Sequence, residues 1–428
     1  MHMPGHKRNP SVTDLLQDIT EIDGFDNLHG PEGLIRDMEL RAKDIWGSDD
    51  AMISVNGASA LIFSSVLSSA KRGDKILIPA NSHISVWHAV ETAGLVPVLM
   101  DPEYAPSMGI YGRIDPGTFG RYLASGDIKA AVVTSPTYEG LISDSVKLHE
   151  IARSHGTILI TDASHGAHFG IRGMKHFNEA MAGDLVIRSV HKTMAAPTQT
   201  AVMLIYGNEP DRSLLRHYLA VNESTSPSYV LMGALDRSLR HIDTDTFYHT
   251  VTEGRKALSA LTRLFLLQTD DVSKFVLETK GYLTGYELSD ILRDRYNIEI
   301  EAAFPAHIIA MTGIGDTKDS LSRFTEALLD VDSLLTEKKD MPSLPRLVPS
   351  SERRFAMNIE DAVRAKKKAV SPKDCEGLIS GEYLFAYPPG SPVLVPGEVI
   401  SKDTLSGERK LKTDPFRRFD GTLLTVDM

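Results

Sequence analysis

Two residues of opposite charge, Asp162 and Lys192, each stand at or just after the end of an aliphatic run. Asp162 ends the run TILITD (157–162), and Lys192 follows the run DLVIRS (184–189). A lysine amine can condense with an aldehyde, and a carboxylate can keep a neighbouring nitrogen protonated. The pair could therefore serve one reaction if the fold brings the two groups together. On its own the signal is weak, because a solvated loop lysine would explain Lys192 about equally well.

The elements that must position this pair alternate along the middle of the chain. Short apolar runs predict strands at 51–56, 75–80, 96–100, 130–135, 157–162, 184–189 and 201–206. Stretches between them predict helices at 58–71, 84–93, 116–124 and 144–155. Such alternation is typical of a mainly parallel sheet covered by helices on both faces. We therefore expect an α/β major domain with a mainly parallel seven-stranded sheet.

Polar clusters follow five of the predicted strands. They read NGAS, NSH, SPT, DASH and SVHK, in chain order. In sheets of this kind, ligands bind beyond the carboxyl ends of the strands. The sequence therefore predicts a pocket at one edge of the sheet, with Asp162 and Lys192 in its wall.

The flanking segments have a different character. Residues 1–45 are rich in Gly, Pro, Asp and His and predict an arm with little core of its own. The major domain is expected over 46–268. An α+β C-terminal domain is expected over 269–428, with strands at 273–279 and 306–314, helices at 286–296 and 321–335, and the segment YPPGSPVLVPGE.

The composition narrows the class of protein. The chain has 428 residues, a net charge of −11 and a single cysteine, Cys375. The negative charge argues against nucleic acid as the main partner, and one cysteine allows no intrachain disulfide. No apolar run approaches the ~20 residues that span a bilayer, and nothing marks the N-terminus for export. A cytoplasmic location is therefore expected.

The paired strand-end residues suit pyridoxal-5′-phosphate (PLP). Its aldehyde forms a Schiff base with a lysine, and a carboxylate beside the pyridine nitrogen lets the ring accept electrons released at Cα of an amino acid. Lys192 and Asp162 would fill these two roles. No residue is assigned to a metal.

The wider motifs make this reading specific. SVHK (189–192) resembles the Ser-x-His-Lys motif of the bacterial ornithine/lysine/arginine decarboxylases, a fold-type I PLP family. Further blocks are similar to that family in the same order: MPGHK (3–7), TEIDGFDNLHGPEG (20–33), VNGAS (55–59), TSPTY (134–138), DASHGAHF (162–169), STSPSY (224–229) and YPPGSPVLVPGE (387–398). The family's larger members carry an N-terminal wing domain, and this chain is expected to be a short form without it.

The resemblance implies roles for individual residues. Lys192 would be the Schiff-base lysine, Asp162 the partner of the pyridine nitrogen and His83 a ring stacked on the cofactor. His191 is a candidate proton donor to Cα, with an orienting histidine as the alternative. Ser59 and Ser189 match phosphate-binding positions, and the helix that follows NGAS would also favour an anion. The implied cofactor contacts are Ala58, Ser59, His83, Asp162, Ser164, His165, Ser189, His191, Lys192 and Ser226.

Two expectations concern the substrate and a second subunit. Ser224, Thr225 and Ser226 fall in a loop that reaches the neighbouring subunit's cofactor in the family, which implies a homodimer. Glu398 falls where the family has a carboxylate near the distal cationic end of the substrate. The alternative for Glu398 is a surface residue in a Pro-rich turn.

Some positions depart from the family pattern. Ala80 and Ile84 stand where basic residues are usual, and Ala163-Ser164 replaces Glu-Ala after the key aspartate. The expected reaction is α-decarboxylation of arginine, lysine or ornithine to an amine of polyamine metabolism. An aminotransferase or another PLP reaction is the alternative, for which Arg353 or Arg354 could grip the substrate carboxylate. A non-catalytic PLP-binding protein is the third possibility.

Overall fold

A computed structural model gives the architecture of the chain. It describes residues 2–15, 17–170, 173–179, 181–240, 245–341, 344, 348–386, 390–405, 411–413, 417–418 and 421–427. The first three residues of the YPPGSPVLVPGE segment, 387–389, lie outside the described residues, as does part of the stretch 337–350. None of the described helices is both long and apolar enough to span a membrane.

The centre of the fold is a seven-stranded sheet, as predicted. Its order is β1-β9-β8-β7-β6-β2-β3, and only β9 runs opposite to its neighbours among these strands. The strands are β1 (Asp50–Ser54), β2 (Lys75–Pro79), β3 (Val96–Met100), β6 (Ile128–Thr134), β7 (Ile158–Asp162), β8 (Leu185–Arg188) and β9 (Ala201–Ile205). The mainly parallel α/β fold class is therefore confirmed.

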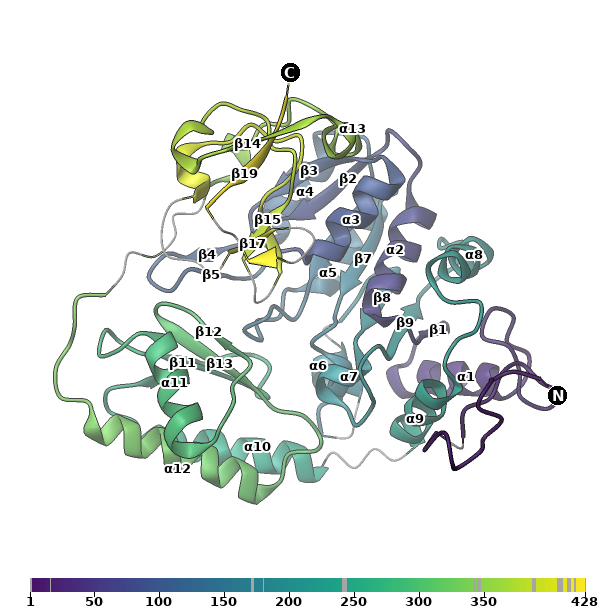
Figure 1. Cartoon of the computed structure of the whole chain (residues 1–428), viewed down its shortest axis with the longest axis horizontal. Helices are drawn as coiled ribbons and strands as arrows, with labels where there is room; N and C mark the ends of the chain where they lie inside the picture. The colour runs from purple at the N-terminus through teal and green to yellow at the C-terminus, as the bar shows by residue number, and fades with distance from the viewer. Residues whose placement is uncertain are drawn as a thin grey trace.

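Helices cover both faces of this sheet, which explains why its strands are apolar throughout. In β2, Ile76 and Ile78 belong to the core shared with α2 (Gly57–Ser69) and α3 (Ile84–Ala93). Leu77 points to the opposite face. There it joins the core shared with α4 (Pro116–Ala124) and α5 (Ser145–Ser154). The short helices α6 (Lys175–Glu179) and α7 (Val190–Thr193) flank β8 (Figure 1).

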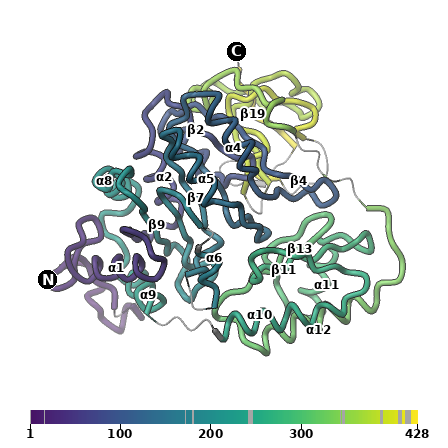
Figure 2. The backbone as a smooth tube through the Cα atoms, turned by 180° about the vertical axis from the view of Figure 1, so that it is seen from behind, coloured from purple at the N-terminus to yellow at the C-terminus, as the bar shows by residue number. Residues whose placement is uncertain are grey.

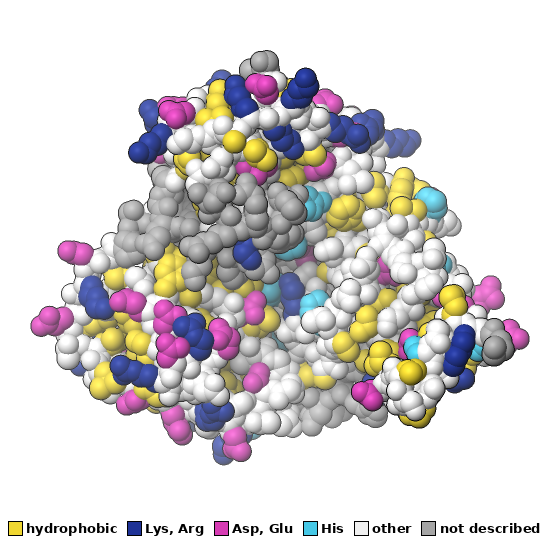
Figure 3. All heavy atoms as spheres, in the orientation of Figure 1, with side chains coloured by type: hydrophobic (Ala, Val, Ile, Leu, Met, Phe, Trp, Pro, Cys, Tyr) yellow, Lys and Arg dark blue, Asp and Glu magenta, His cyan; other side chains and the backbone are white. Residues whose placement is uncertain are grey.

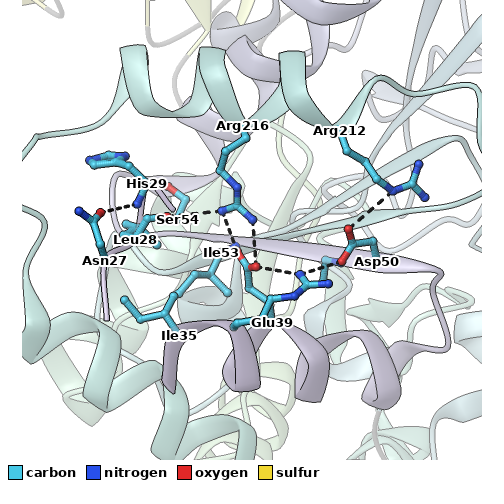
Figure 4. Close-up of polar contacts among 12 residues, drawn as sticks. Asn27, Leu28, His29, Ile35, Glu39, Asp50, Ile53, Ser54, Arg212 and Arg216 are labelled. Carbon is cyan, nitrogen blue, oxygen red and sulfur yellow. Dashed lines mark hydrogen bonds and ion pairs between the residues drawn. The ribbon is translucent and has the colours of Figure 1, made fainter. Parts of the chain in front are cut away.

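The predicted arm leads into α1 (Leu34–Trp46), which lies beside β1, α8 (Arg212–Asn222) and α9 (Tyr229–Arg240) (Figures 1 and 2). No helix or strand is assigned to its described residues before Leu34. A buried carboxylate fastens these elements together. Glu39 of α1 accepts hydrogen bonds from Arg36 at 3.0 Å and from Arg216 of α8 at 2.8 and 2.9 Å (Figure 4).

A second, antiparallel sheet lies beside the major domain. Its order is β10-β11-β13-β12, formed by β10 (Phe265–Leu266), β11 (Lys274–Glu278), β12 (Ala302–Ala303) and β13 (His307–Met311). It packs with α10 (Asp245–Ala257), α11 (Gly285–Tyr296) and α12 (Lys318–Leu334) around one apolar core. The predicted boundary at 268/269 falls between the paired strands β10 and β11. We therefore propose that this domain begins ahead of α10.

The C-terminal segment forms a layer of its own, above the second sheet and on the same side of the major domain (Figures 1 and 2). Its core residues Tyr383 and Phe385 join the apolar cluster around α3. Tyr383 also donates a hydrogen bond to Glu91 of α3 at 2.8 Å. The layer contains α13 (Ile359–Arg364), β14 (Lys367–Val370), β15 (Leu384–Ala386), β16 (Ser391–Leu394), β17 (Leu411–Thr413), β18 (Arg417–Arg418) and β19 (Leu423–Val426).

Candidate active site

A cavity of about 790 Å³ opens where the major domain, the second sheet and the C-terminal layer meet. Figure 3 shows histidine and basic side chains gathered in the hollow between these parts. Its wall includes nine of the residues predicted from the sequence: Ala58, Ser59, His83, Asp162, Ser164, His165, Ser189, His191 and Lys192. Ser226 and Glu398 are absent from the described lining.

Asp162 and Lys192 reach the cavity because they follow neighbouring parallel strands. Asp162 ends β7, while Lys192 lies in α7, just beyond β8. Oδ1 of Asp162 accepts hydrogen bonds from the Ser164 hydroxyl at 2.5 Å and the Ser164 amide at 3.1 Å. Oδ2 has no hydrogen-bond partner within the described part of the chain. Burial lowers the pKa of Lys192, against the opposing effect of Asp162.

His83 is a neutral, flat ring at the start of α3. As the N-cap of that helix, its Nδ1 accepts a hydrogen bond from the Ser85 amide at 3.2 Å. Nε2 therefore carries the proton in the neutral ring. Burial, followed by the positive charge of Lys192, lowers the pKa of His83 to about 4. An uncharged ring in the cavity wall suits stacking on an aromatic ligand.

His165 lies between two lysines. Its Nε2 is 3.1 Å from Nζ of Lys192, and its Nδ1 is 3.1 Å from Nζ of Lys274. Lys274 is the first residue of β11 and therefore comes from the second sheet. The sequence reading missed it, although a lysine at the start of a predicted apolar strand was a visible signal.

A helix N-terminus forms one end of the cavity. Gly57, with a φ of +81°, starts α2, and Asn56 provides no side-chain cap. Asn56 instead donates to the Asn222 carbonyl at 2.7 Å, which ties this turn to the end of α8. The first amides of a helix favour an anion. The hydroxyls of Ser59 and Ser189 face the same cavity and have no hydrogen-bond partner among the described residues.

His191 is half-buried in the cavity wall. Its Nδ1 lies 3.1 Å from the Thr200 carbonyl, so Nδ1 carries the proton of the neutral ring. Nε2 is then the nitrogen that can exchange a proton with a ligand. Burial, followed by Lys192, lowers the pKa of His191, although the Thr200 carbonyl opposes this effect.

These groups match the chemistry of PLP. The α2 amides with Ser59 and Ser189 suit a phosphate, Asp162 a pyridinium nitrogen, His83 a ring face and Lys192 an aldehyde. Two further atoms of residues in the cavity wall, Oγ1 of Thr134 and Oδ1 of Asn81, are buried and have no hydrogen-bond partner among the residues that the structure describes. Orphaned polar atoms in the wall are those that a polar ligand would satisfy. The described residues include no cluster of three or more metal-ligating side chains.

Glu398 is buried and ion-paired. Its carboxylate accepts two hydrogen bonds from Arg353, at 2.7 and 2.6 Å. The side chains of Glu398 and Arg353 are only 2% and 5% exposed. Arg353 lines the cavity and Glu398 does not, whereas Arg354 is exposed. The Glu398 carboxylate is therefore occupied by Arg353. This geometry does not favour the predicted contact between Glu398 and the substrate, which stays a prediction.

The cavity also contains acidic and tyrosine side chains that the sequence reading missed. Glu301 accepts a hydrogen bond from Tyr138 at 2.8 Å, and both lie in the wall with Glu139. Burial raises the pKa of Glu139 to about 7. A hairpin of β4 (Tyr104–Ala105) and β5 (Ile110–Tyr111) adds Tyr104 and Tyr111 to the same wall.

Ser226 lies outside this cavity. Ser224, Thr225 and Ser226 are exposed, and the Ser224 carbonyl lies 2.8 Å from Nε2 of His29 in the arm. The loop follows Glu223, whose carboxylate accepts hydrogen bonds from the Ser54 hydroxyl and from the Val55 amide. The loop thus follows a residue that is bonded to the end of β1, and its three residues are absent from the described lining of the cavity.

The sheet, with lysine and aspartate at the ends of neighbouring strands, defines the fold-type I class, whose members generally use PLP. The family model "Orn/Lys/Arg decarboxylase, major domain" matches residues 13–274, and the C-terminal domain model of that family matches residues 344–411. The chain belongs to the Orn/Lys/Arg decarboxylase family, which confirms the resemblance seen in its motifs.

Individual relatives agree with this assignment. An arginine decarboxylase of Halalkalibacterium halodurans is 28% identical, over 95% of this chain and 88% of its own length. An arginine decarboxylase of Bacillus subtilis is 27% identical over 95% and 89%. The lysine decarboxylase LdcF of Francisella novicida has the same fold, with a TM-score of 0.82 and 17% identity over 100% of this chain and 79% of that chain.

Proposed function

We propose that this protein is a PLP-dependent decarboxylase that converts a basic amino acid to the corresponding amine. The observation that carries the proposal is one cavity that contains Lys192, Asp162 and His83 in a chain of the Orn/Lys/Arg decarboxylase family. Arginine, lysine and ornithine are the candidate substrates, and the product would enter polyamine metabolism. We further propose that the protein acts in the cytoplasm.

The residues of this chain divide the work of the reaction. Lys192 would hold PLP, with its phosphate at Ala58, Ser59 and Ser189 and its ring between Asp162 and His83. When bound, PLP accepts the electron pair that is released at Cα as CO₂ leaves. A proton must then reach Cα. We propose that Nε2 of His191, which is not the nitrogen that contacts the Thr200 carbonyl, delivers it.

The substrate would extend from Lys192 toward the acidic side of the cavity. Glu301 and Glu139 are carboxylates in that wall and could pair with an ammonium or a guanidinium. The net charge of −11 also favours a cationic substrate over an anionic one. We therefore propose that Glu301 and Glu139, rather than Glu398, meet the basic end of the substrate.

A spectrum followed by a CO₂ assay tests the proposal. Purified protein with PLP should show the visible absorbance band of lysine-bound cofactor, and one of arginine, lysine or ornithine should then release CO₂. Lys192→Ala should abolish the band and reduce turnover at least 10³-fold. Lys280→Ala changes a surface lysine and should leave both unchanged. A normal band without CO₂ from any of the three amino acids would exclude the decarboxylase.

One observation favours aminotransfer as a second candidate. Arg353 is part of the cavity wall, and although its Nε and Nη2 donate to Glu398, an aminotransferase could use such an arginine to bind the carboxylate of a substrate. The ureidoglycine–glyoxylate aminotransferase of Bacillus subtilis also shares the fold, with a TM-score of 0.57 and 16% identity over 72% of this chain and 86% of that chain. Conversion of the cofactor to pyridoxamine phosphate by an amino acid alone would favour this activity. A visible band with no turnover of any amino acid would indicate a non-catalytic PLP-binding protein.

A further inference from the structure

Lys274 has a buried amine that takes no part in the proposed reaction as described above. Its side chain is fully buried, and its Nζ lies 3.1 Å from Nδ1 of His165. The other nitrogen of the same imidazole lies 3.1 Å from Nζ of Lys192. Lys274 forms no ion pair with any residue that the structure describes. Burial of an unpaired amine is costly, so its position calls for a functional explanation.

The surroundings of Lys274 hold it in place. Asp271, three residues earlier, is fully buried and lies 3.1 Å from Nε2 of His168. The stem of Lys274 passes under Gly140, where a Cβ atom would come within 2.8 Å of Lys274 Cγ. Two histidines of DASHGAHF therefore contact the start of β11, one through Lys274 and one through Asp271. This double contact fixes the Lys274 amine against the active site.

The numbers of donors and acceptors restrict where the protons can lie on Lys192, His165 and Lys274. A neutral imidazole has one N–H donor and one acceptor nitrogen. If Nε2 of His165 accepts from the Lys192 ammonium, Nδ1–H must donate to the lone pair of a neutral Lys274. Burial favours that state, since it lowers the pKa of Lys274 to about 8 and holds the pKa of His165 well below its usual value.

We propose that Lys274 takes up, through His165, the proton that Lys192 must lose before its amine can attack the aldehyde of PLP. The ammonium of Lys192 gives a proton to Nε2 while Nδ1 gives its proton to Lys274. Lys192 becomes neutral, the imidazole changes tautomer, and Lys274 becomes an ammonium. Lys274 acts through His165 and is therefore a positioning residue. The inference rests on the proposed cofactor-bearing role of Lys192.

The charges around Lys192 and Lys274 give the direction in which Lys274 shifts the pKa of Lys192. Asp162 and Glu301 favour the ammonium form of Lys192, and His83 and His165 are neutral neighbours. Asp271, Glu301 and Glu139 favour the ammonium form of Lys274, whereas burial and the charge of Lys192 oppose it. When Lys274 holds the proton, its positive charge disfavours a second proton on Lys192. Without Lys274, Lys192 would keep its proton to higher pH.

Carbamylation by cyanate measures the pKa of the Lys192 amine without PLP. Isocyanic acid, the reactive form, adds only to a neutral amine, so the rate in total cyanate falls to half its plateau at the pKa of that amine. The rate of modification at Lys192 is followed by peptide mass spectrometry from pH 6 to pH 10 in the full-length protein. Lys274→Met keeps the packed stem and removes the amine. We expect the pH of half-maximal rate at Lys192 to rise by about one unit. Lys280→Met, at an exposed lysine of the same domain, should leave it unchanged.

Different outcomes separate this inference from the proposed function. An unchanged or lower midpoint in a Lys274→Met protein that melts like the wild type would overturn the role of Lys274. Should that variant fail to fold, Lys274→Gln lacks the charge but keeps a hydrogen-bond partner for His165, and the same rise is expected. Borohydride trapping of added PLP on wild-type Lys192 tests the cofactor site separately. Failure to trap PLP there would remove the proposed function and leave the cyanate result standing.

Discussion

At the scale of single residues, Ser164 affects what Asp162 can offer to a ligand. Both hydrogen bonds to Oδ1 come from Ser164, from its hydroxyl at 2.5 Å and its amide at 3.1 Å. Oδ1 is thereby held by residue 164, and Oδ2 has no hydrogen-bond partner among the described residues. The serine that replaces the family's usual alanine thus adds a hydrogen bond to the Asp162 carboxylate. The sequence alone suggested a contact between this hydroxyl and the cofactor ring.

Substitution of Ser164 measures that contribution. Ser164→Ala removes the hydroxyl donor, keeps the amide donor and leaves Asp162 less well oriented. Loss of one hydrogen bond to a charged group costs about 1.5 kcal/mol, so we expect PLP to bind roughly 10-fold more weakly. Absorbance titration with PLP gives the dissociation constant. Ser154→Ala, on the exposed face of α5, is the control, and PLP binding by Ser164→Ala as tight as wild type would contradict the argument.

At the scale of elements, the position of the phosphate end depends on helices far from the cofactor lysine. Glu39 of α1 is fully buried and pairs with Arg216 of α8. The end of α8 in turn holds the turn at Asn56 through the Asn222 carbonyl. The arm-side helices therefore determine where α2 begins.

A neutral residue at position 39 should loosen this anchor. Glu39→Gln leaves Arg36 and Arg216 facing each other without a buried negative charge, and we expect a loss of about 3 kcal/mol of unfolding free energy. Urea denaturation followed by circular dichroism measures it. Glu360→Gln removes the partner of Arg72, whose side chain is 69% exposed, and should cost less than about 1 kcal/mol. Equal stability losses in the two variants would show that burial of Glu39 is unimportant.

The sequence predicted the elements of the major domain closely, because apolar runs and helix periodicity are local signals. All seven predicted strands are present, and the predicted helices at 84–93 and 116–124 have the same bounds as α3 and α4. Nine predicted site residues follow strand ends or helix starts and reach the cavity for that reason. Their roles remain predictions.

The residues that were missed reach the cavity from other parts of the chain. Lys274 contacts His165 across 109 positions, and Glu301 accepts a hydrogen bond from Tyr138 across 163. Such contacts depend on how the second sheet and the C-terminal layer dock on the major domain. Hydrophobic periodicity within a segment contains no information about that docking.

At the scale of the whole molecule, we propose that the loop 224–226 and the exposed apolar residues of the arm and of α8 face a second subunit. Ser224, Thr225 and Ser226 are exposed beside the arm and are absent from the described lining of their own cavity. Large apolar side chains are exposed in the arm and at the end of α8, including Val12, at 66%, and Val221, at 64%. Association of two chains through this face would bury them. We propose that Ser226 completes the phosphate site of the partner subunit.

Complementation between two inactive variants tests this arrangement. Lys192→Ala lacks the cofactor lysine, and Ser226→Phe places a bulky ring in the loop, so each homodimer should be inactive. If each site combines Lys192 of one subunit with Ser226 of the other, one of the two sites in every hybrid dimer is intact. Equal amounts unfolded together and refolded should regain roughly a quarter of wild-type activity, because about half of the dimers are hybrids with one intact site. Mixing without refolding is the control. A Ser226→Phe homodimer with full activity would place the loop outside the site. If both homodimers are inactive and joint refolding restores no activity, Ser226 and Lys192 would belong to the same subunit's site.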